Sequence, residues 1–140
     1  MISLPLRKKI NLILLNDGEG RFPRHEVWLV RRGAYGQVTG YVYVWITHRG
    51  AVPAQDRIEL DEDYQGLGLG TDIVRALTAH YGHYRSDSFG QTNELAAKVW
   101  QRLGGRPGPH GSKFYLNLAH LPKPGQSDLP PTGPPPTSGP

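Results

Sequence analysis

The stretch of sequence that decides the fold reads Leu60-Asp61-Glu62-Asp63-Tyr64-Gln65-Gly66-Leu67-Gly68-Leu69-Gly70-Thr71. It lies between a predicted strand, Arg57 to Asp61, and a predicted helix that begins at Thr71. Glycines let the backbone adopt positive φ values and let a ligand approach without a Cβ in the way. The helix points its free amides and the positive end of its dipole back at this loop. Strand, loop and helix start together predict an anion site, suited to a diphosphate.

The same loop lacks the features of two common nucleotide-binding motifs. It has no Gly-Lys-Ser/Thr ending, so it cannot hold a γ-phosphate and Mg²⁺ as a P-loop does. Its glycines at positions 66, 68 and 70 do not fit the Gly-x-Gly-x-x-Gly fingerprint of dinucleotide-binding domains. A glycine-rich connection that serves only tight packing is the alternative to an anion site.

The sequence around the loop predicts an α+β fold. Strands are predicted from their apolar runs, alternation and turn signals at Ile10–Leu15, Val27–Arg31, Val38–Thr47, Arg57–Asp61, His83–Ser88 and Lys113–Ala119. Helical spacing of apolar residues predicts one helix from Thr71 to a C-terminal cap at Gly82, and a second from about Thr92 or Asn93 to Gly104-Gly105. We therefore expect a mixed, mostly antiparallel sheet of about six strands with two helices.

Length and composition predict one folded domain, residues 1–121, and a disordered tail. The tail, Pro122 to Pro140, contains 8 Pro and 3 Gly and offers little to a packed core; a proline-rich ligand for an aromatic groove is the alternative. No apolar run approaches the ~18 residues that cross a bilayer, so we expect no membrane span. With 0 Cys, no disulfide framework or thiolate metal site is available, which fits a cytoplasmic location. The net charge of +4 attracts anions, but the basic residues are spread along the chain, which disfavours nucleic-acid binding without excluding it.

Two motifs resemble those of the GNAT superfamily of acetyl-CoA-dependent N-acetyltransferases. The family's cofactor motif, Gln/Arg-x-x-Gly-x-Gly/Ala after a strand, is matched at every position by Gln65 to Gly70. The second motif, Asn-x-x-Ala-x-x-x-Tyr-x-x-x-Gly, is matched by Asn93, Ala96, Trp100 and Gly104, with Trp in place of Tyr. The resemblance covers about residues 26 to 119 and implies a GNAT-type sheet.

The resemblance also implies a function, which is transfer of the acetyl group of acetyl-CoA to a primary amine by direct attack. The cofactor-binding residues that it implies are Leu60, Asp61, Gln65, Gly66, Leu67, Gly68, Leu69, Gly70, Thr71, Asn93 and Trp100. Amides from Gly66 to Thr71 would hold the pyrophosphate, and Asn93 would contact the pantetheine arm. The main chain around Leu60 and Asp61 would pair with that arm in a splayed gap between strands and polarise the thioester carbonyl.

The sequence departs from the family at the catalytic groups. Trp100 replaces the Tyr that often protonates the departing thiolate, and an indole has no readily ionised proton. A general base is not evident, and the candidates are Glu59, on the strand before the loop, and His48, at the end of the preceding strand. The histidines show no spacing typical of metal ligands, so no metal is expected.

A second departure concerns the acceptor. Family members place two helices between the first two strands of the sheet, whereas only Asp17 to Glu26 is available here. The acceptor wall is therefore reduced, or supplied by a partner such as a second copy of the chain. The acceptor, a small-molecule or protein amine, is not disclosed. The alternative function is a non-catalytic GNAT-like module that acts through protein or nucleic-acid contacts.

Overall fold

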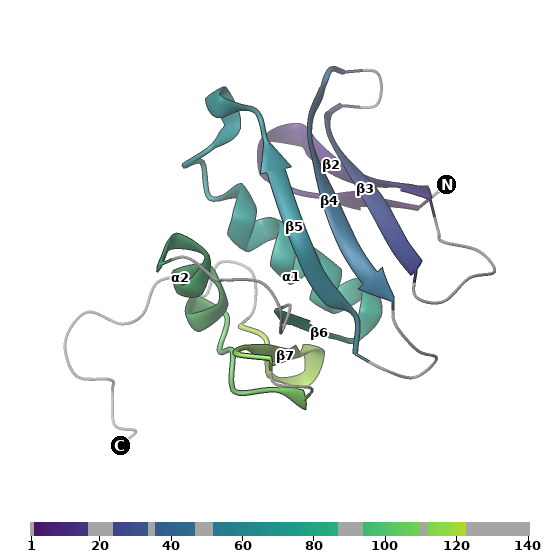
Figure 1. Ribbon diagram of the computed structural model, residues 1–140. Coiled ribbons are helices and arrows are strands. Elements are labelled where there is room, and N and C mark those ends of the chain that lie inside the picture. The colour runs from purple at the N-terminus through teal and green to yellow at the C-terminus, as the bar shows by residue number, and fades with distance from the viewer. Residues whose placement is uncertain are drawn as a thin grey trace.

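The computed structural model describes residues 2–16, 24–33, 36–46, 52–86, 94–109 and 112–122. They form one seven-stranded sheet and two α-helices, joined by short 3-10 turns (Figure 1). The strands are β1 (Ser3–Pro5), β2 (Ile10–Asn16), β3 (Arg24–Arg32), β4 (Val38–Ile46), β5 (Ala54–Leu60), β6 (His83–Ser86) and β7 (Tyr115–Asn117). The helices are α1 (Leu69–Tyr81) and α2 (Glu94–Arg102).

The strands lie in the sheet in the order of the sequence, from β1 to β7. Every neighbouring pair is antiparallel except β5 and β6, which run parallel because α1 crosses between them. The predicted mixed, mostly antiparallel α+β fold with two helices is confirmed. The additional strand, β1, has three residues including Pro5, too few for a periodic signal.

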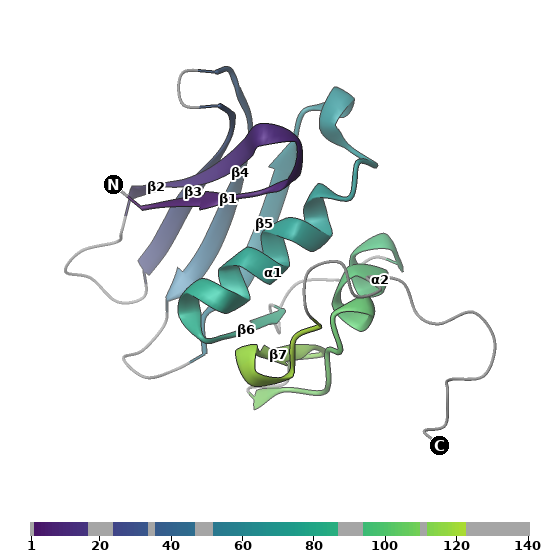
Figure 2. The same cartoon turned by 180° about the vertical axis from the view of Figure 1, so that it is seen from behind.

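Helix α1 packs against one face of the sheet, as Figure 2 shows. Its buried side chains include Ile73, Val74 and Leu77, which join Val42 and other strand residues in a single core. The helix ends where expected, because Gly82 adopts the left-handed conformation, φ 86°, and donates its N–H to the Thr78 carbonyl.

The core extends under α2 through a column of aromatic rings. Trp100 of α2 stacks on Tyr84 of β6, with ring centroids 5.5 Å apart, and on Phe114, at 6.4 Å. Only 2% of Trp100 is exposed. This column anchors α2 beside β6 and so fixes one wall of the site described below.

The connection between β2 and β3 is as short as the sequence predicted. Strand β2 ends at Asn16 and β3 begins at Arg24, which leaves too few residues for two helices. Neither of the described helices has the length and apolar character needed to cross a membrane. The predictions for the tail beyond Pro122 fall outside the described residues.

Candidate cofactor-binding and active site

Strands β5 and β6 pair only at one end and then separate. The paired positions are Ala54 with Arg85 and Gln55 with Ser86, whereas β5 continues to Leu60. In Figure 1, β5 runs away from β6 toward the turn that precedes α1. Among the described residues, none pairs with this edge of β5 between Gln55 and the glycine loop.

The register of β5 shows which backbone groups point into this gap. The Asp61 N–H donates to the Thr39 carbonyl of β4 at 2.7 Å. Because the groups of an antiparallel strand alternate in direction, the N–H and C=O groups of Ile58 and Leu60 point away from β4. The Leu60 carbonyl accepts a hydrogen bond from the Gln65 side-chain amide at 3.0 Å. The N–H and C=O groups of Ile58 and the N–H group of Leu60 are thus the backbone groups available to an extended ligand.

The glycine loop presents backbone donors at the start of α1. Gly66 and Gly68 have φ values of 76° and 81°, which turn the chain sharply into the helix. In the described part of the chain, the N–H groups from Gly66 to Thr71 donate to no protein acceptor, whereas the Asp72 N–H already donates to the Gly68 carbonyl. Amides of this kind, together with the helix dipole, are suited to binding an anion.

A cavity of about 390 Å³ lies between the unpaired edge of β5, the glycine loop and α2. Ile58 and Leu60 line it on the sheet side, and Lys98 and Arg102, one helical turn apart on α2, line it on the other. Two cations thus border the same cavity as the unpaired loop amides. The cavity suits an elongated ligand with an anionic end near the loop.

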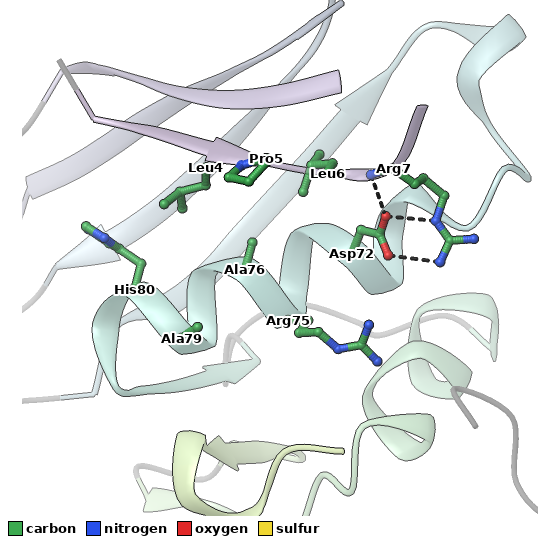
Figure 3. A pocket seen from close by; sticks show the side chains of 9 residues that line it. All are labelled: Leu4, Pro5, Leu6, Arg7, Asp72, Arg75, Ala76, Ala79 and His80. Carbon is green, nitrogen blue, oxygen red and sulfur yellow. Dashed lines mark hydrogen bonds and ion pairs between the residues drawn. The ribbon is translucent and has the colours of Figure 1, made fainter. Parts of the chain in front are cut away.

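The glycine loop is supported from behind by the hairpin between β1 and β2. Figure 3 shows the Arg7 guanidinium against the Asp72 carboxylate, with Nε–Oδ2 at 2.8 Å and Nη2–Oδ1 at 2.9 Å. The Arg7 backbone N–H donates to the same carboxylate at 3.0 Å. This bidentate pair fixes the hairpin to the first turn of α1 and offsets a negative charge close to the anion site.

A second cavity, of about 500 Å³, lies on the opposite side of α1, between that helix and β1 (Figure 3). Its lining includes Leu4, Leu6, Ala76 and His80, but none of the loop residues from 65 to 70. It is therefore separate from the site that the motifs predict.

A polar pair lies beside the first cavity, where β5 pairs with β6. The hydroxyl of Tyr84, which is fully buried, donates to the Gln55 side-chain oxygen at 3.1 Å. Burial, and then the nearby Tyr81 and Asp56, raise the pKa of Tyr84 well above its ordinary value, so the hydroxyl stays protonated. Gln55 and Trp100 both line the cavity.

Most of the residues expected to bind a cofactor lie around this cavity. Those that line it are Leu60, Gln65, Gly66, Gly68, Leu69, Gly70, Thr71 and Trp100. The backbone N–H of Asp61 donates to Thr39 of β4 instead, and the Leu67 side chain packs against the core. Asn93 lies outside the described residues.

Neither candidate base is among the described residues that line the cavity. Glu59 lies on the opposite face of β5 from its neighbours Ile58 and Leu60, half exposed, with its carboxylate 3.5 Å from Arg57. His48 lies outside the described residues. The described lining contains no carboxylate and no imidazole, and in the described chain no cluster of three acidic or histidine side chains could hold a metal ion.

Sequence reasoning missed several residues of the cavity. Ile58 could have been found from strand alternation, and Lys98 with Arg102 from helical spacing, since both patterns are in the sequence. No local signal marks Gln55, because its place depends on where β6 stops pairing with β5. Tyr64 also lines the cavity, from the short turn before the loop.

Three solved structures illustrate what the fold is similar to. A cAMP-binding acyltransferase from Mycobacterium smegmatis aligns with a TM-score of 0.51 and 18% identity, over 87% of this chain and 50% of that chain. A mutant of the AtaT toxin bound to the C-terminus of the antitoxin AtaR aligns with a TM-score of 0.48 and 18% identity, over 68% of this chain and 67% of that chain. A putative acyl-CoA N-acyltransferase from Klebsiella pneumoniae aligns with a TM-score of 0.45 and 16% identity, over 67% of this chain and 72% of that chain.

At 18% identity, the mycobacterial structure shows a similarity of fold alone, and this chain spans only half of that protein. A comparison with curated protein sequences found no match. The model of the acetyltransferase (GNAT) family matches residues 7–104, which include strands β2 to β6, the glycine loop and both helices. This chain therefore belongs to the GNAT family.

Proposed function

We propose that this protein is an N-acetyltransferase that moves the acetyl group of acetyl-CoA to a primary amine. The observation that carries the proposal is the set of N–H groups from Gly66 to Thr71 that have no acceptor among the described residues. They border the same cavity as the edge of β5 that no described residue pairs with. A pyrophosphate needs such donors, and a pantetheine arm with two amides needs such an edge.

The cofactor would lie along β5 with its phosphates at the glycine loop. The Leu60 and Ile58 backbone groups would pair with the pantetheine amides, while Lys98 and Arg102 would attract the phosphates. This pairing differs from the sequence-based prediction at Asp61, whose N–H already has an acceptor in Thr39. The arm would enter the gap much as an added strand pairs with a sheet edge.

The chemistry is direct attack of the amine nitrogen on the thioester carbon. The C–S bond then breaks, its electron pair stays on sulfur, and the amine loses one proton. With no Cys in the chain, no acetyl-cysteine intermediate is available. Trp100 stands where a family Tyr would protonate the thiolate, so we expect the coenzyme A to leave as a thiolate. Glu59 and His48 remain our candidates for the base.

Isothermal titration calorimetry with three ligands tests the proposal. Acetyl-CoA and CoA should bind, and S-acetylpantetheine, which lacks the phosphates, should bind at least tenfold more weakly because the loop amides and cations have no anion to contact. Equal binding of all three would contradict an anion site at the loop. No binding of acetyl-CoA would overturn the proposed function.

Thiol release in the presence of an amine panel then separates the enzyme from the alternative. An acetyltransferase should release free CoA at a rate that depends on the amine and falls about a hundredfold in Glu59→Gln if that carboxylate is the base. Binding of acetyl-CoA without amine-dependent release would instead favour a non-catalytic module.

A further inference from the structure

We propose that Gln55 is a catalytic residue whose side-chain amide donates a hydrogen bond to the thioester carbonyl oxygen of the bound acyl donor, and that Tyr84 positions it. This proposal rests on the proposed function. Gln55 lines the cavity at the end where β5 pairs with β6.

The position of the thioester follows from the length of the gap. At about 3.3 Å per residue, β5 spans about 17 Å between Leu60, beside the glycine loop, and Gln55. A pantetheine arm has about as many chain bonds as four extended residues, or about 14 Å. An arm that starts from a phosphate at the loop therefore ends close to Gln55.

The orientation of the Gln55 amide is fixed by its partner. The Tyr84 hydroxyl donates to the Gln55 Oε1 atom at 3.1 Å, which occupies the acceptor end of the amide. The Tyr84 ring is fully buried and stacks on Trp100 at 5.5 Å, so the hydroxyl has little freedom to move. The Nε2 group, with its two N–H donors, is the end of the amide that a ligand in the cavity can use.

This donor would act where negative charge develops. As the amine attacks, the carbonyl oxygen gains charge, and a donor already held in place stabilises that charge without reorganisation. No proton is transferred by Gln55. The electron pair of the C–S bond leaves with sulfur, as in the reaction above. Since Trp100 offers no acid to the leaving group, stabilisation of the carbonyl oxygen takes a larger share of the catalysis.

Infrared spectroscopy of bound acetyl-CoA, labelled with ¹³C at the carbonyl, tests the proposal without knowledge of the acceptor. In the wild type the carbonyl band should lie at lower wavenumber than in Gln55→Leu, because the hydrogen bond weakens the C=O bond. Tyr84→Phe, which keeps the ring but frees the amide, should give an intermediate shift. Tyr81→Phe is the matched control, since the Tyr81 hydroxyl bonds Glu26 and Trp28 instead, and should leave the band unchanged.

The rate of thiol release, with water or an active amine, should fall about a hundredfold in Gln55→Leu while the Kd for acetyl-CoA changes less than threefold. Gln55→Leu removes the acceptor of the buried Tyr84 hydroxyl, which destabilises the fold. The double variant Gln55→Leu/Tyr84→Phe removes both polar groups and avoids this cost. An unchanged carbonyl band in both Gln55 variants, or equal losses of rate and affinity, overturns this proposal but not the proposed function. Failure of the wild type to bind acetyl-CoA overturns both.

Discussion

At the residue scale, the two glycines with positive φ at the loop have different surroundings. A Cβ at Gly66 would meet no atom within 4 Å, whereas a Cβ at Gly68 would lie 2.7 Å from the Nη1 atom of Arg7. Gly68 therefore serves two purposes, since it allows the turn and admits the guanidinium that binds Asp72. The sequence shows the glycine pattern but does not predict that the Arg7 guanidinium lies against Gly68, because the two residues are far apart in the chain.

Alanine at each glycine separates these two purposes. Gly66→Ala should lower the free energy of unfolding by about 1 kcal/mol, the cost of a left-handed conformation with a side chain. Gly68→Ala should lower it by about 2 kcal/mol, because Arg7 must also leave its bidentate position. Urea denaturation measures both. Equal losses would mean that Arg7 moves aside at no cost.

The buried Tyr84 predicts how stability depends on alkaline pH. Its pKa is raised in the folded protein, mainly by burial, whereas an unfolded Tyr titrates near 10. Its contribution is therefore complete below pH 10 and decreases as the pH rises above that value, because only the unfolded chain releases the proton. Tyr84→Phe should remove part of this decline, as seen in the midpoint of urea unfolding between pH 9 and 11. An identical pH profile in the variant would contradict the assignment.

At the element scale, the β1–β2 hairpin and α1 are joined by the Arg7–Asp72 pair. The Asp72 side chain is only 12% exposed, and the Arg7 side chain 40%. A double-mutant cycle with Arg7→Gln and Asp72→Asn should give a coupling energy of about 1 kcal/mol, which decreases in high salt. A coupling of zero at low salt would show that the pair does not hold the hairpin.

The elements differ in how far the sequence predicts them. Helix α1 has a clear apolar period and a Gly82 cap, so its existence and its end are predictable. The antiparallel pairs from β2 to β5 are also predictable, since a Gly-containing connection joins each strand to the next. Strand β1 and the start of α1 at Leu69, ahead of Thr71, were missed, because three residues or half a turn carry no periodic signal.

The site is less predictable than the elements that build it. The glycine motif lies beside a cavity, as the sequence predicted, and the anion site itself stays a prediction. The cavity also depends on where the described pairing of β5 with β6 ends, which no local pattern marks. Gln55, Ile58 and Leu60 all line the cavity from β5. The resemblance to the family predicts a gap beside the strand that precedes the loop. The register of β5 against β4 identifies Ile58 and Leu60 as the residues whose backbone groups point into it.

At the scale of the whole molecule, the fold provides a cavity suited to the proposed cofactor and leaves little chain for an acceptor site. Few residues separate β2 from β3, where the family resemblance leads us to expect two helices, and the described residues place no helix over the face of β5 that carries Glu59. An acceptor or a partner that meets this face would approach the thioester through the gap beside β5. We therefore expect acetyl-CoA affinity to be independent of protein concentration, and transfer to an amine to be the step that a partner stimulates.

The central claim, an anion site at the start of α1, is tested most directly by comparing Gly70→Asp with the uncharged Gly70→Asn. A Cβ at Gly70 would lie 3.6 Å from Val99, an ordinary contact, so both variants should fold. Aspartate in the first turn should stabilise the ligand-free protein by about 0.5 kcal/mol relative to asparagine, through the helix dipole. The same charge should weaken acetyl-CoA binding at least tenfold relative to asparagine, because it repels the pyrophosphate. Opposite signs of these two effects, by urea unfolding and calorimetry, are the predicted result; equal acetyl-CoA affinity of the two variants would contradict the account.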